Sequence, residues 1–285
     1  MAELSAIPFR KMNGLGNDFV VLDARARPLA IGENQARAIA DRNTGIGCDQ
    51  VIVIEPSKVA DVTMRIWNNE GFEVESCGNA SRCIADLLFA EKRSDMATID
   101  TKGGFLNARK AAGGMVTVDN GVPRFDWKEI PLSEAFHDTR HIELQVGPIE
   151  APLIHSPSVV NVGNPHCIFW VKDLGVVDLA KIGPMLEFHP LFPERANISL
   201  ARVDARDHIT MKVWERGAGL TRACGTAACA AIAAGVRIKA VERKCRVSLP
   251  GGDLMMEWRE ADDHILMTGP VAYEFEGTLP EGLLA

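Results

Sequence analysis

Apolar residues along the chain gather in short runs between turn-forming residues, and their spacing predicts both strands and helices. Four runs rich in β-branched and aromatic residues are typical of strands. They lie at residues 20–22, 51–54, 168–171 and 247–249. Residues 34–42 favour a short helix that ends at the helix-breaking sequence Asn43-Thr44-Gly45.

Two longer segments predict helices that are buried against other structure. Residues 80–92 carry apolar side chains at positions 83, 84, 87 and 88 and alanines at 85 and 90, which fits one broad buried face. Residues 227–236 are almost entirely alanine, cysteine and isoleucine, and a helix that is apolar all round is usually enclosed. Near the C-terminus, the alternation of Val271, Tyr273 and Phe275 indicates a final strand.

Both buried helices belong to a pattern that occurs twice, 147 positions apart. Thr63-Met64-Arg65-Ile66-Trp67 matches Thr210-Met211-Lys212-Val213-Trp214. Without a gap, Cys77-Gly78-Asn79-Ala80 then falls on Cys224-Gly225-Thr226-Ala227. The same offset pairs Gly16 with Gly163 and Pro123 with Pro270, so we expect it to hold from residue 16 to residue 123.

The repeat predicts two similar domains that face each other about a pseudo-twofold axis. We expect them at residues 1–122 and 123–270, with a strand in residues 271–285 returning to the first domain. Residues 126–150 have no counterpart in the repeat. Each domain is predicted to be a curved, mainly antiparallel sheet wrapped around one central helix. The fold class is therefore α/β (α+β), with the active site between the domains.

Composition narrows the function. A net charge of −7 and a pI near 5.6 argue against nucleic acid as a partner. No run approaches ~18 consecutive apolar residues, so no membrane span is expected. The first residues lack the features of a signal peptide, which favours a cytoplasmic location.

The chain has seven cysteines and no Cys-x-x-Cys pair, which favours free thiols over a zinc site. Five of them are expected to be small buried apolar side chains: Cys48, Cys83, Cys167, Cys229 and Cys245.

The duplicated Cys-Gly pair indicates acid–base chemistry by two thiols. Cys77 and Cys224 each precede a predicted helix, whose N-terminal N–H groups and dipole favour an anion. The following glycine lets a ligand approach the backbone closely. One thiolate removes an α-proton, and a thiol on the opposite face returns one, so that the configuration inverts. We expect no metal and no other cofactor.

Polar residues that pair across the repeat are expected to surround this site. The pairs are Asn17 with Asn164, Gln50 with Asn197, Asn68 with Glu215 and Asn69 with Arg216. Arg216 is suited to bind a carboxylate through two hydrogen bonds. Glu215 is suited to bind an ammonium group or to tune a thiol, and His166 is suited to tune a cysteine.

Six motifs together resemble diaminopimelate epimerase over nearly the whole chain. They are Met12-Asn13-Gly14-Leu15-Gly16-Asn17-Asp18-Phe19, Gly45-Ile46-Gly47-Cys48-Asp49-Gln50, Cys77-Gly78-Asn79, Gly163-Asn164-Pro165-His166, Glu215-Arg216-Gly217 and Ala223-Cys224-Gly225-Thr226. The resemblance implies a cofactor-independent enzyme that converts LL-diaminopimelate to the meso form for lysine and peptidoglycan synthesis. It also implies the two-lobed fold of that family and a homodimer.

Carried over by motif, the resemblance assigns roles to individual residues. Cys77 and Cys224 are the acid/base pair. The substrate is bound by the side chains of Asn13, Gln50, Asn68, Asn164, Asn197, Glu215 and Arg216, and by the backbones of Gly78, Asn79, Gly225 and Thr226. His166 and Glu215 adjust the thiols. One departure is that Ala80 and Ala227 stand where the family often has glycine.

Two alternatives remain open from the sequence. Proline and hydroxyproline racemases also oppose two cysteines, but they typically have His after Cys-Gly and Asp before the second Cys, where this chain has Asn79 and Ala223. A phenazine-type isomerase of the same architecture lacks the cysteine pair. The other alternative is a ligand-binding or redox protein that forms a Cys77–Cys224 disulfide.

Overall fold

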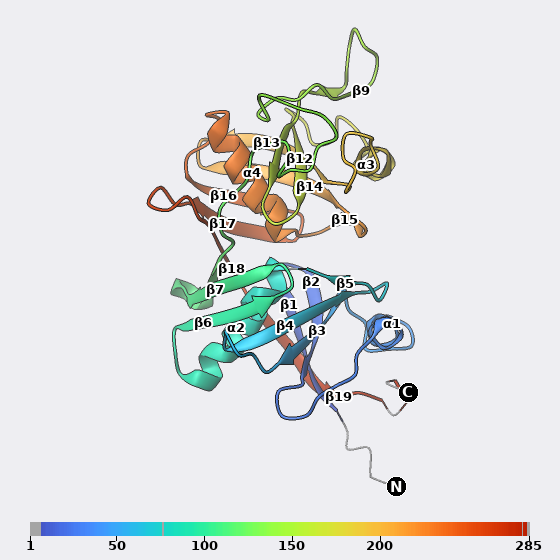
Figure 1. The fold of residues 1–285 in the computed structure, drawn as a ribbon, viewed down its shortest axis with the longest axis vertical. Helices are drawn as coiled ribbons and strands as arrows, with labels where there is room; N and C mark the ends of the chain where they lie inside the picture. Colours follow the sequence, from blue (N-terminus) through green and yellow to red (C-terminus); the bar gives the residue numbers. More distant parts are fainter. Residues whose placement is uncertain (1–6, 76, 281, 284–285) are drawn as a thin grey trace. The chain divides into compact units, whose positions relative to one another are not determined.

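A computed structural model describes residues 7–75, 77–280 and 282–283. The chain divides into two compact units (Figure 1). The first unit contains the residues up to Val118 together with those from Gly269 onward, and the second unit runs from Asp119 to Thr268. Both ends of the chain therefore contribute to the first unit.

The first unit is built on a mixed, mainly antiparallel sheet. Its strands are β1 (Pro8–Gly14), β2 (Asn17–Asp23), β3 (Gln50–Glu55), β4 (Val62–Asn68), β5 (Glu73–Val74), β6 (Met96–Thr101), β7 (Gly104–Lys110) and β19 (Ala272–Thr278), and β8 (Val116–Asp119) leads into the second unit. The hydrogen-bonded order is β19-β1-β2-β3-β4-β6-β7, with the short β5 also beside β4. Only β2–β3 and β4–β6 are parallel among these pairings.

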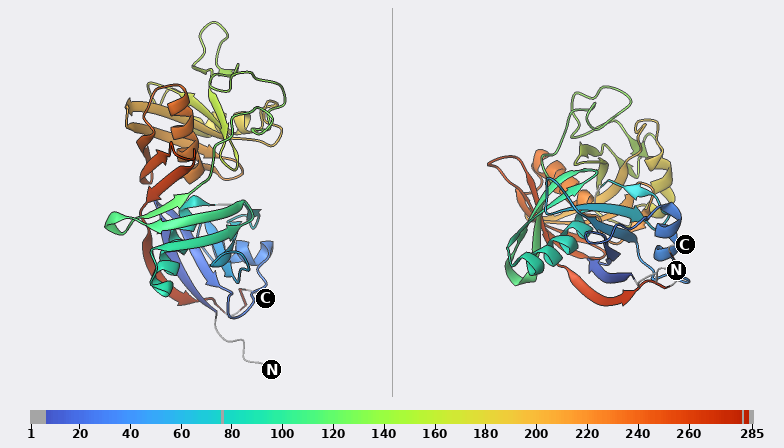
Figure 2. Two further views of the ribbon diagram at one scale, coloured as in Figure 1. Left: turned by 60° about the vertical axis from the view of Figure 1, so that its left-hand side comes forward. Right: turned by 60° about the horizontal axis from the view of Figure 1, so that its bottom comes forward.

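Two α-helices pack on this sheet (Figures 1 and 2). Helix α2 (Gly78–Lys92) lies against β1, β6 and β7, and α1 (Glu33–Ala40) lies against β3 and β4. A short 3-10 turn, η1, follows β7 at Ala112–Gly114. Helix α1 buries Ile39 in a cluster that includes Trp67 of β4, and full burial of such an aliphatic side chain stabilises the fold by about 1.5–3 kcal/mol.

The second unit repeats this plan. Its strands are β9 (Gln145–Val146), β10 (Ile154–His155), β11 (Ser158–Asn161), β12 (Pro165–Trp170), β13 (Asn197–Ala205), β14 (His208–Glu215), β15 (Gly219–Thr221), β16 (Lys244–Leu249), β17 (Gly252–Trp258) and β18 (Ile265–Gly269). The main sheet has the order β11-β12-β13-β14-β16-β17-β18, with β15 also beside β14. Strands β9 and β10 pair separately in a hairpin that extends from this sheet (Figure 2).

Helix α4 (Gly225–Arg237) corresponds to α2, and α3 (Leu179–Glu187) corresponds to α1. Helix α4 packs on β11, β12, β13, β16 and β17, and its alanines are buried on every side, as its composition predicts. Helix α3 packs against β13, β14 and β15. It buries Leu179 and Leu186 in a cluster that includes Trp214 of β14. The repeated tryptophans thus occupy equivalent positions in the two hydrophobic cores.

Strand register confirms the repeat and also shows where its constant offset ends. Phe19 pairs with Gln50 in the first unit, and His166 pairs with Asn197 in the second unit. His166 follows Phe19 by 147 positions, and Asn197 follows Gln50 by the same number. After α2 and α4 the equivalent hairpins begin with Thr101 paired to Gly104 and Leu249 paired to Gly252, 148 positions apart. The expectation that 147 holds to residue 123 was therefore wrong, because the second unit has one more residue between the start of its central helix and the start of the next strand.

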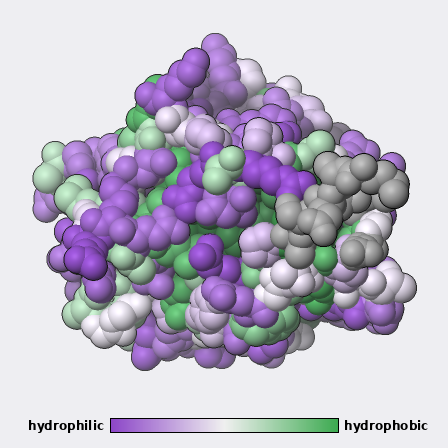
Figure 3. All heavy atoms as spheres, turned by 90° about the horizontal axis from the view of Figure 1, so that it is seen from below, coloured by the Kyte–Doolittle hydropathy of each residue, from purple (hydrophilic) through white to green (hydrophobic). Residues whose placement is uncertain are grey.

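The face in Figure 3 is mostly hydrophilic, with smaller hydrophobic areas between the polar side chains. Within the described part of the chain, no helix combines the length and apolar character needed to cross a membrane.

Candidate active site

Cys77 stands at the N-cap of α2, where the chain changes from an extended to a helical conformation. The N–H groups of Gly78 and Asn79 open the helix behind it, so this end can receive a negative charge. The half-buried Cys77 Sγ donates to Asn17 Oδ1 over 3.6 Å. Because Asn17 begins β2, the sheet brings this amide to the helix terminus across 60 residues of sequence.

Gln50 and Asn68 also lie in the first unit, paired across β3 and β4. The side-chain oxygen Asn68 Oδ1 accepts from the backbone N–H groups of Glu70 and Phe72, at 3.2 and 2.8 Å, and so shapes the turn into β5. Gln50 Oε1 is buried and has no hydrogen-bond partner among the described residues. A buried acceptor of this kind is costly unless a ligand supplies a donor, which supports the predicted binding role of Gln50.

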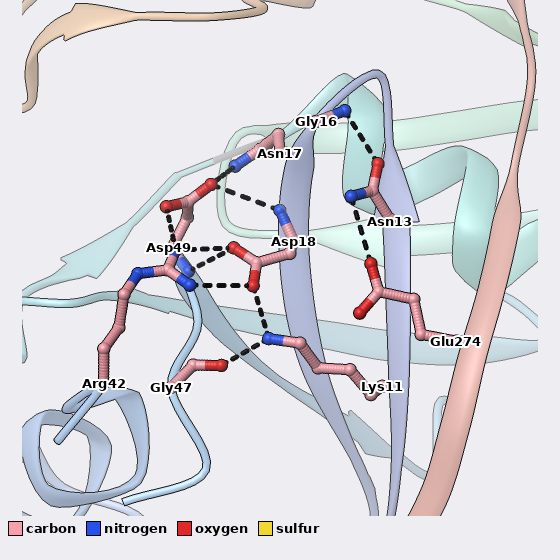
Figure 4. A network of polar contacts seen from close by, with 9 residues as sticks. All are labelled: Lys11, Asn13, Gly16, Asn17, Asp18, Arg42, Gly47, Asp49 and Glu274. Atoms are coloured by element: carbon pink, nitrogen blue, oxygen red, sulfur yellow. Dashed lines mark hydrogen bonds and ion pairs between the residues drawn. The ribbon is translucent and has the colours of Figure 1, made fainter. Parts of the chain in front are cut away.

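The Asn13 amide is hydrogen-bonded to neighbours within the first unit, and the substrate-binding role that the resemblance implies for it stays a prediction. Its Oδ1 accepts from the Gly16 N–H at 2.7 Å, and its Nδ2 donates to Glu274 Oε1 at 3.2 Å (Figure 4). Both ends of the amide therefore hold the β1–β2 turn and β19. Cys77 contacts Asn17, which the resemblance left out of the binding set but which the repeat pairs with Asn164.

Cys224 occupies the equivalent N-cap of α4 and is only 5% exposed. Its Sγ lies 3.4 Å from Thr226 Oγ1. Burial raises the pKa of the Cys224 thiol well above its usual value, and the nearby Glu215 carboxylate, which accepts a hydrogen bond from the thiol, raises that pKa further. The helix terminus was expected to favour the thiolate, but burial and Glu215 outweigh it here. Burial and Glu215 therefore favour the protonated thiol at Cys224.

Glu215, at the end of β14, is held in place by the adjacent strand β15, whose Thr221 hydroxyl donates to Glu215 Oε1. Replacing Glu215 by glutamine is expected to lower the pKa of Cys224, since the negative charge is lost, although burial keeps that pKa above its usual value. Alkylation of Cys224 measured against pH should then begin at a lower pH than in wild type. Glu242→Gln, an exposed carboxylate paired with Arg206, should leave that profile unchanged, and an unshifted profile in Glu215→Gln would show that the carboxylate does not act on the thiol.

The other predicted residues of the second unit form one connected group. His166 Nε2 donates to Asn164 Oδ1 at 2.8 Å, and Asn197 Oδ1 accepts from the Arg216 N–H at 2.9 Å. Burial, followed by the charge of Arg216, lowers the pKa of His166 to about 3, so the imidazole is neutral near pH 7. Its Nδ1 is buried without a partner among the described residues. The ring thus acts as a dipole rather than as a cation.

Glu187 is a buried carboxylate that sequence reasoning did not identify. It ends α3, accepts from Trp214 Nε1 at 2.7 Å and accepts from the Gly217 N–H at 3.1 Å. These bonds hold the Trp214 indole and the Gly217 backbone, one on each side of Glu215 and Arg216 in the sequence. No motif marks Glu187, because its role depends on a helix that the hydrophobic pattern did not reveal.

The five remaining cysteines are buried, as predicted. Cys48, Cys83, Cys167, Cys229 and Cys245 are all buried. Burial raises the pKa of Cys48 and of Cys83 to about 12. Ala80 and Ala227, at the predicted departure from the family, are fully buried inside their helices.

Comparison with known proteins agrees with the motifs. The sequence model of the family described as diaminopimelate epimerase matches residues 9–125 and 158–274, which are the two halves of the repeat. The diaminopimelate epimerase of Rhodopseudomonas palustris (strain BisB18) is 52% identical over 287 residues, covering 100% of this chain and 99% of the relative.

Solved structures share the fold at low sequence identity. A hydroxyproline epimerase from Agrobacterium vitis superposes with a TM-score of 0.69 at 15% identity, covering 98% of this chain and 94% of that one. A phenazine biosynthesis protein from Bacillus anthracis gives a TM-score of 0.67 at 18% identity, covering 97% and 100%. These likenesses confirm the two-domain α/β fold, but they do not distinguish among the families that share it. The full-length sequence match does distinguish them, and the chain belongs to the diaminopimelate epimerase family.

Proposed function

We propose that this protein interconverts LL-2,6-diaminopimelate and meso-diaminopimelate in the formation of lysine and peptidoglycan precursors. The observation that carries the proposal is the helix N-terminus with a cysteine at its N-cap, present once in each unit of a chain of this family. An α-proton of an amino acid is very weakly acidic, so its removal needs a base of suitable pKa and preorganised donors for the developing charge. Each helix terminus combines a thiol with such donors.

Cys77 and Cys224 are proposed to share the acid and base roles. In the productive form one cysteine is a thiolate and the other is a thiol. The thiolate takes the α-proton and becomes a thiol, while the other thiol delivers its proton to the opposite face of the carbanion and becomes the thiolate. The C–H bond that breaks is replaced by a new C–H bond of inverted configuration, and the reverse reaction exchanges the roles. The chemistry needs no cofactor.

The remaining predicted residues are proposed to hold the substrate. The N–H groups of Gly78, Asn79, Gly225 and Thr226 and the Arg216 guanidinium meet carboxylate groups. Glu215 meets an ammonium group and, with the neutral His166, adjusts the thiols. The amides of Gln50, Asn68, Asn164 and Asn197 supply neutral hydrogen bonds. The amide of Asn13, which also shapes the turn before Asn17, is proposed to contact the substrate as well.

The protein is further proposed to work in the cytoplasm as a homodimer, with a small-molecule substrate and without nucleic acid or membrane as partner. The acidic composition supports the last point, because a nucleic-acid site needs a basic surface. The family to which the chain belongs supports the others.

Substrate choice gives the direct test of this function. Reduced protein is expected to form meso-diaminopimelate from the LL isomer, and its kcat/KM for diaminopimelate should exceed that for L-proline or trans-4-hydroxy-L-proline by at least about 100-fold. Chiral chromatography of each reaction measures the conversion. Preferential turnover of either proline substrate would replace the proposal by proline racemisation, and turnover of none would remove it.

A further inference from the structure

The amide of Asn17 belongs to a hydrogen-bonded series whose direction is fixed by a charged group at each end. Arg82 Nη2 donates to Asn79 Oδ1 at 2.8 Å, and Asn79 Nδ2 donates to Asn17 Oδ1 at 3.3 Å. Asn17 Nδ2 then donates to Asp49 Oδ2 at 3.0 Å. A guanidinium can only donate and a carboxylate can only accept, so neither amide can turn over without placing two donors or two acceptors together.

Asp49 is itself held firmly. Its Oδ1 accepts from Arg42 Nη2 at 2.7 Å, and its Oδ2 also accepts from the Asp18 N–H at 3.2 Å. Arg42 spans Asp49 and Asp18, and Asp18 in turn receives the buried ammonium group of Lys11 (Figure 4). The carboxylate that faces Asn17 is therefore part of a rigid ionic cluster formed by β1, β2 and the segment before β3.

The Asn17 amide connects this ionic cluster to Cys77. Because Nδ2 of Asn17 is committed to Asp49, Oδ1 must face the helix terminus, where it accepts from Cys77 Sγ at 3.6 Å. We propose that Asp49 is a positioning residue, which acts through the Asn17 amide to orient the Cys77 S–H bond and to favour the protonated thiol at that cysteine. This inference rests on the proposed two-thiol function.

At the corresponding positions, the second unit lacks the side chains that would form such a series. The repeat places Ala196 opposite Asp49, Thr226 opposite Asn79 and Cys229 opposite Arg82. Asn164, the counterpart of Asn17, is held through its carbonyl by His166 instead, and Cys224 has Glu215 and Thr226 beside it. The two thiols are therefore controlled by different groups, and removal of Asp49 should affect Cys77 alone.

The test uses Asp49→Asn in the full-length, reduced protein. An amide at position 49 no longer requires a donor from Asn17, so the Asn17 amide can turn and present an N–H to the sulfur, which favours the thiolate. Because the thiolate is the nucleophile, native carbamidomethylation of Cys77 at fixed pH should become about three- to tenfold faster, as a change of one hydrogen bond allows. Charged groups on the elements around Cys77, namely Arg82, Asp18, Arg42 and Lys11, are unchanged in this variant. Epimerisation should fall by about ten- to 100-fold in kcat.

Two further variants separate positioning from folding. Arg42→Gln breaks the ion pair with Asp49 but leaves the Asn17–Asp49 bond, so Cys77 should be alkylated at close to the wild-type rate. Asn17→Ala removes the acceptor while keeping Asp49, and should accelerate Cys77 alkylation as Asp49→Asn does. Peptide mass mapping gives the rates for both cysteines, with Cys224 as the internal reference.

The outcomes are distinct. Faster alkylation confined to Cys77 in Asp49→Asn and Asn17→Ala supports the inference. Wild-type alkylation in both variants, or an equal increase in Arg42→Gln, overturns it while leaving wild-type epimerisation intact. The proposed function would instead be refuted by a wild-type protein that does not epimerise diaminopimelate, whatever the alkylation rates of its cysteines.

Discussion

Replacing either Cys77 or Cys224 by serine is expected to lower kcat for epimerisation by about 100- to 10,000-fold, the usual contribution of a positioned general acid or base. A serine hydroxyl is a far weaker acid than a thiol, so it neither forms the anion that removes the α-proton nor delivers a proton readily to the carbanion. Both variants should fail in both directions, because each cysteine is the base in one direction and the acid in the other. Chiral chromatography of each isomer measures the two rates.

Serine is also the substitution least able to disturb the fold at these positions. Each cysteine is the N-cap of its helix, and serine is among the preferred N-cap residues. Cys83→Ala on α2 and Cys229→Ala on α4 are matched controls, because both are buried cysteines of the same helices. These controls should retain turnover, and full activity of either serine variant would remove that cysteine from the mechanism.

Asp18→Asn is expected to lower the free energy of unfolding by about 3–5 kcal/mol, the usual consequence of removing one partner from a buried ion pair. Lys11 is 4% exposed, and its ammonium group has Asp18 and the Gly47 carbonyl as hydrogen-bond acceptors. The amide leaves this positive charge buried without a counterion and also breaks the Arg42 ion pair. Urea unfolding followed by circular dichroism measures the change.

Acid unfolding supplies a second measurement of the same group. Burial opposes ionisation of Asp18, but hydrogen bonds from Arg42 and Lys11 outweigh it and lower the pKa from 3.8 to about 2. The stabilisation is therefore fully present above about pH 4 and is lost as the pH falls towards 2. Asp18→Asn should lack this part of the acid dependence. The control Asp23→Asn, which breaks a partly exposed pair with Arg25, should cost less than about 1 kcal/mol, and an equal loss in both variants would refute the buried-pair explanation.

The apolar pattern predicted those helices whose buried residues form a regular or unbroken series in the sequence. The apolar spacing of residues 80–92 and the alanine-rich residues 227–236 correspond to α2 and α4 within two residues at each end. Helix α3 was not predicted, since it contains Gly183 and Pro184, both poor helix residues. Its glycine has a tertiary cause, because a Cβ at Gly183 would lie 2.4 Å from the Trp214 ring. Contacts of this kind are invisible to local propensity.

Site residues could be predicted from the sequence where the same pattern occurs in both halves of the repeat. Duplication identified Cys77 and Cys224 as helix N-caps and paired Asn17 with Asn164, whereas the prediction for Asn13 rests on motif matching alone. The series from Asp49 through Asn17 to Asn79 joins a loop, a strand and a helix, so no sequence spacing reveals it. The raised pKa of Cys224 depends likewise on burial and on a carboxylate nine residues earlier, which outweigh the helix terminus.

The most direct measurement of the central claim is label transfer from solvent by the reduced wild-type protein. LL-diaminopimelate is incubated in deuterium oxide without added metal or cofactor, and the early product is examined by mass spectrometry and proton NMR. The account predicts meso product with one deuterium, located at the inverted α-carbon, while the other α-carbon keeps its hydrogen. Meso product that retains the original α-hydrogen at the inverted centre, or no label in either isomer, would contradict proton exchange by two thiols.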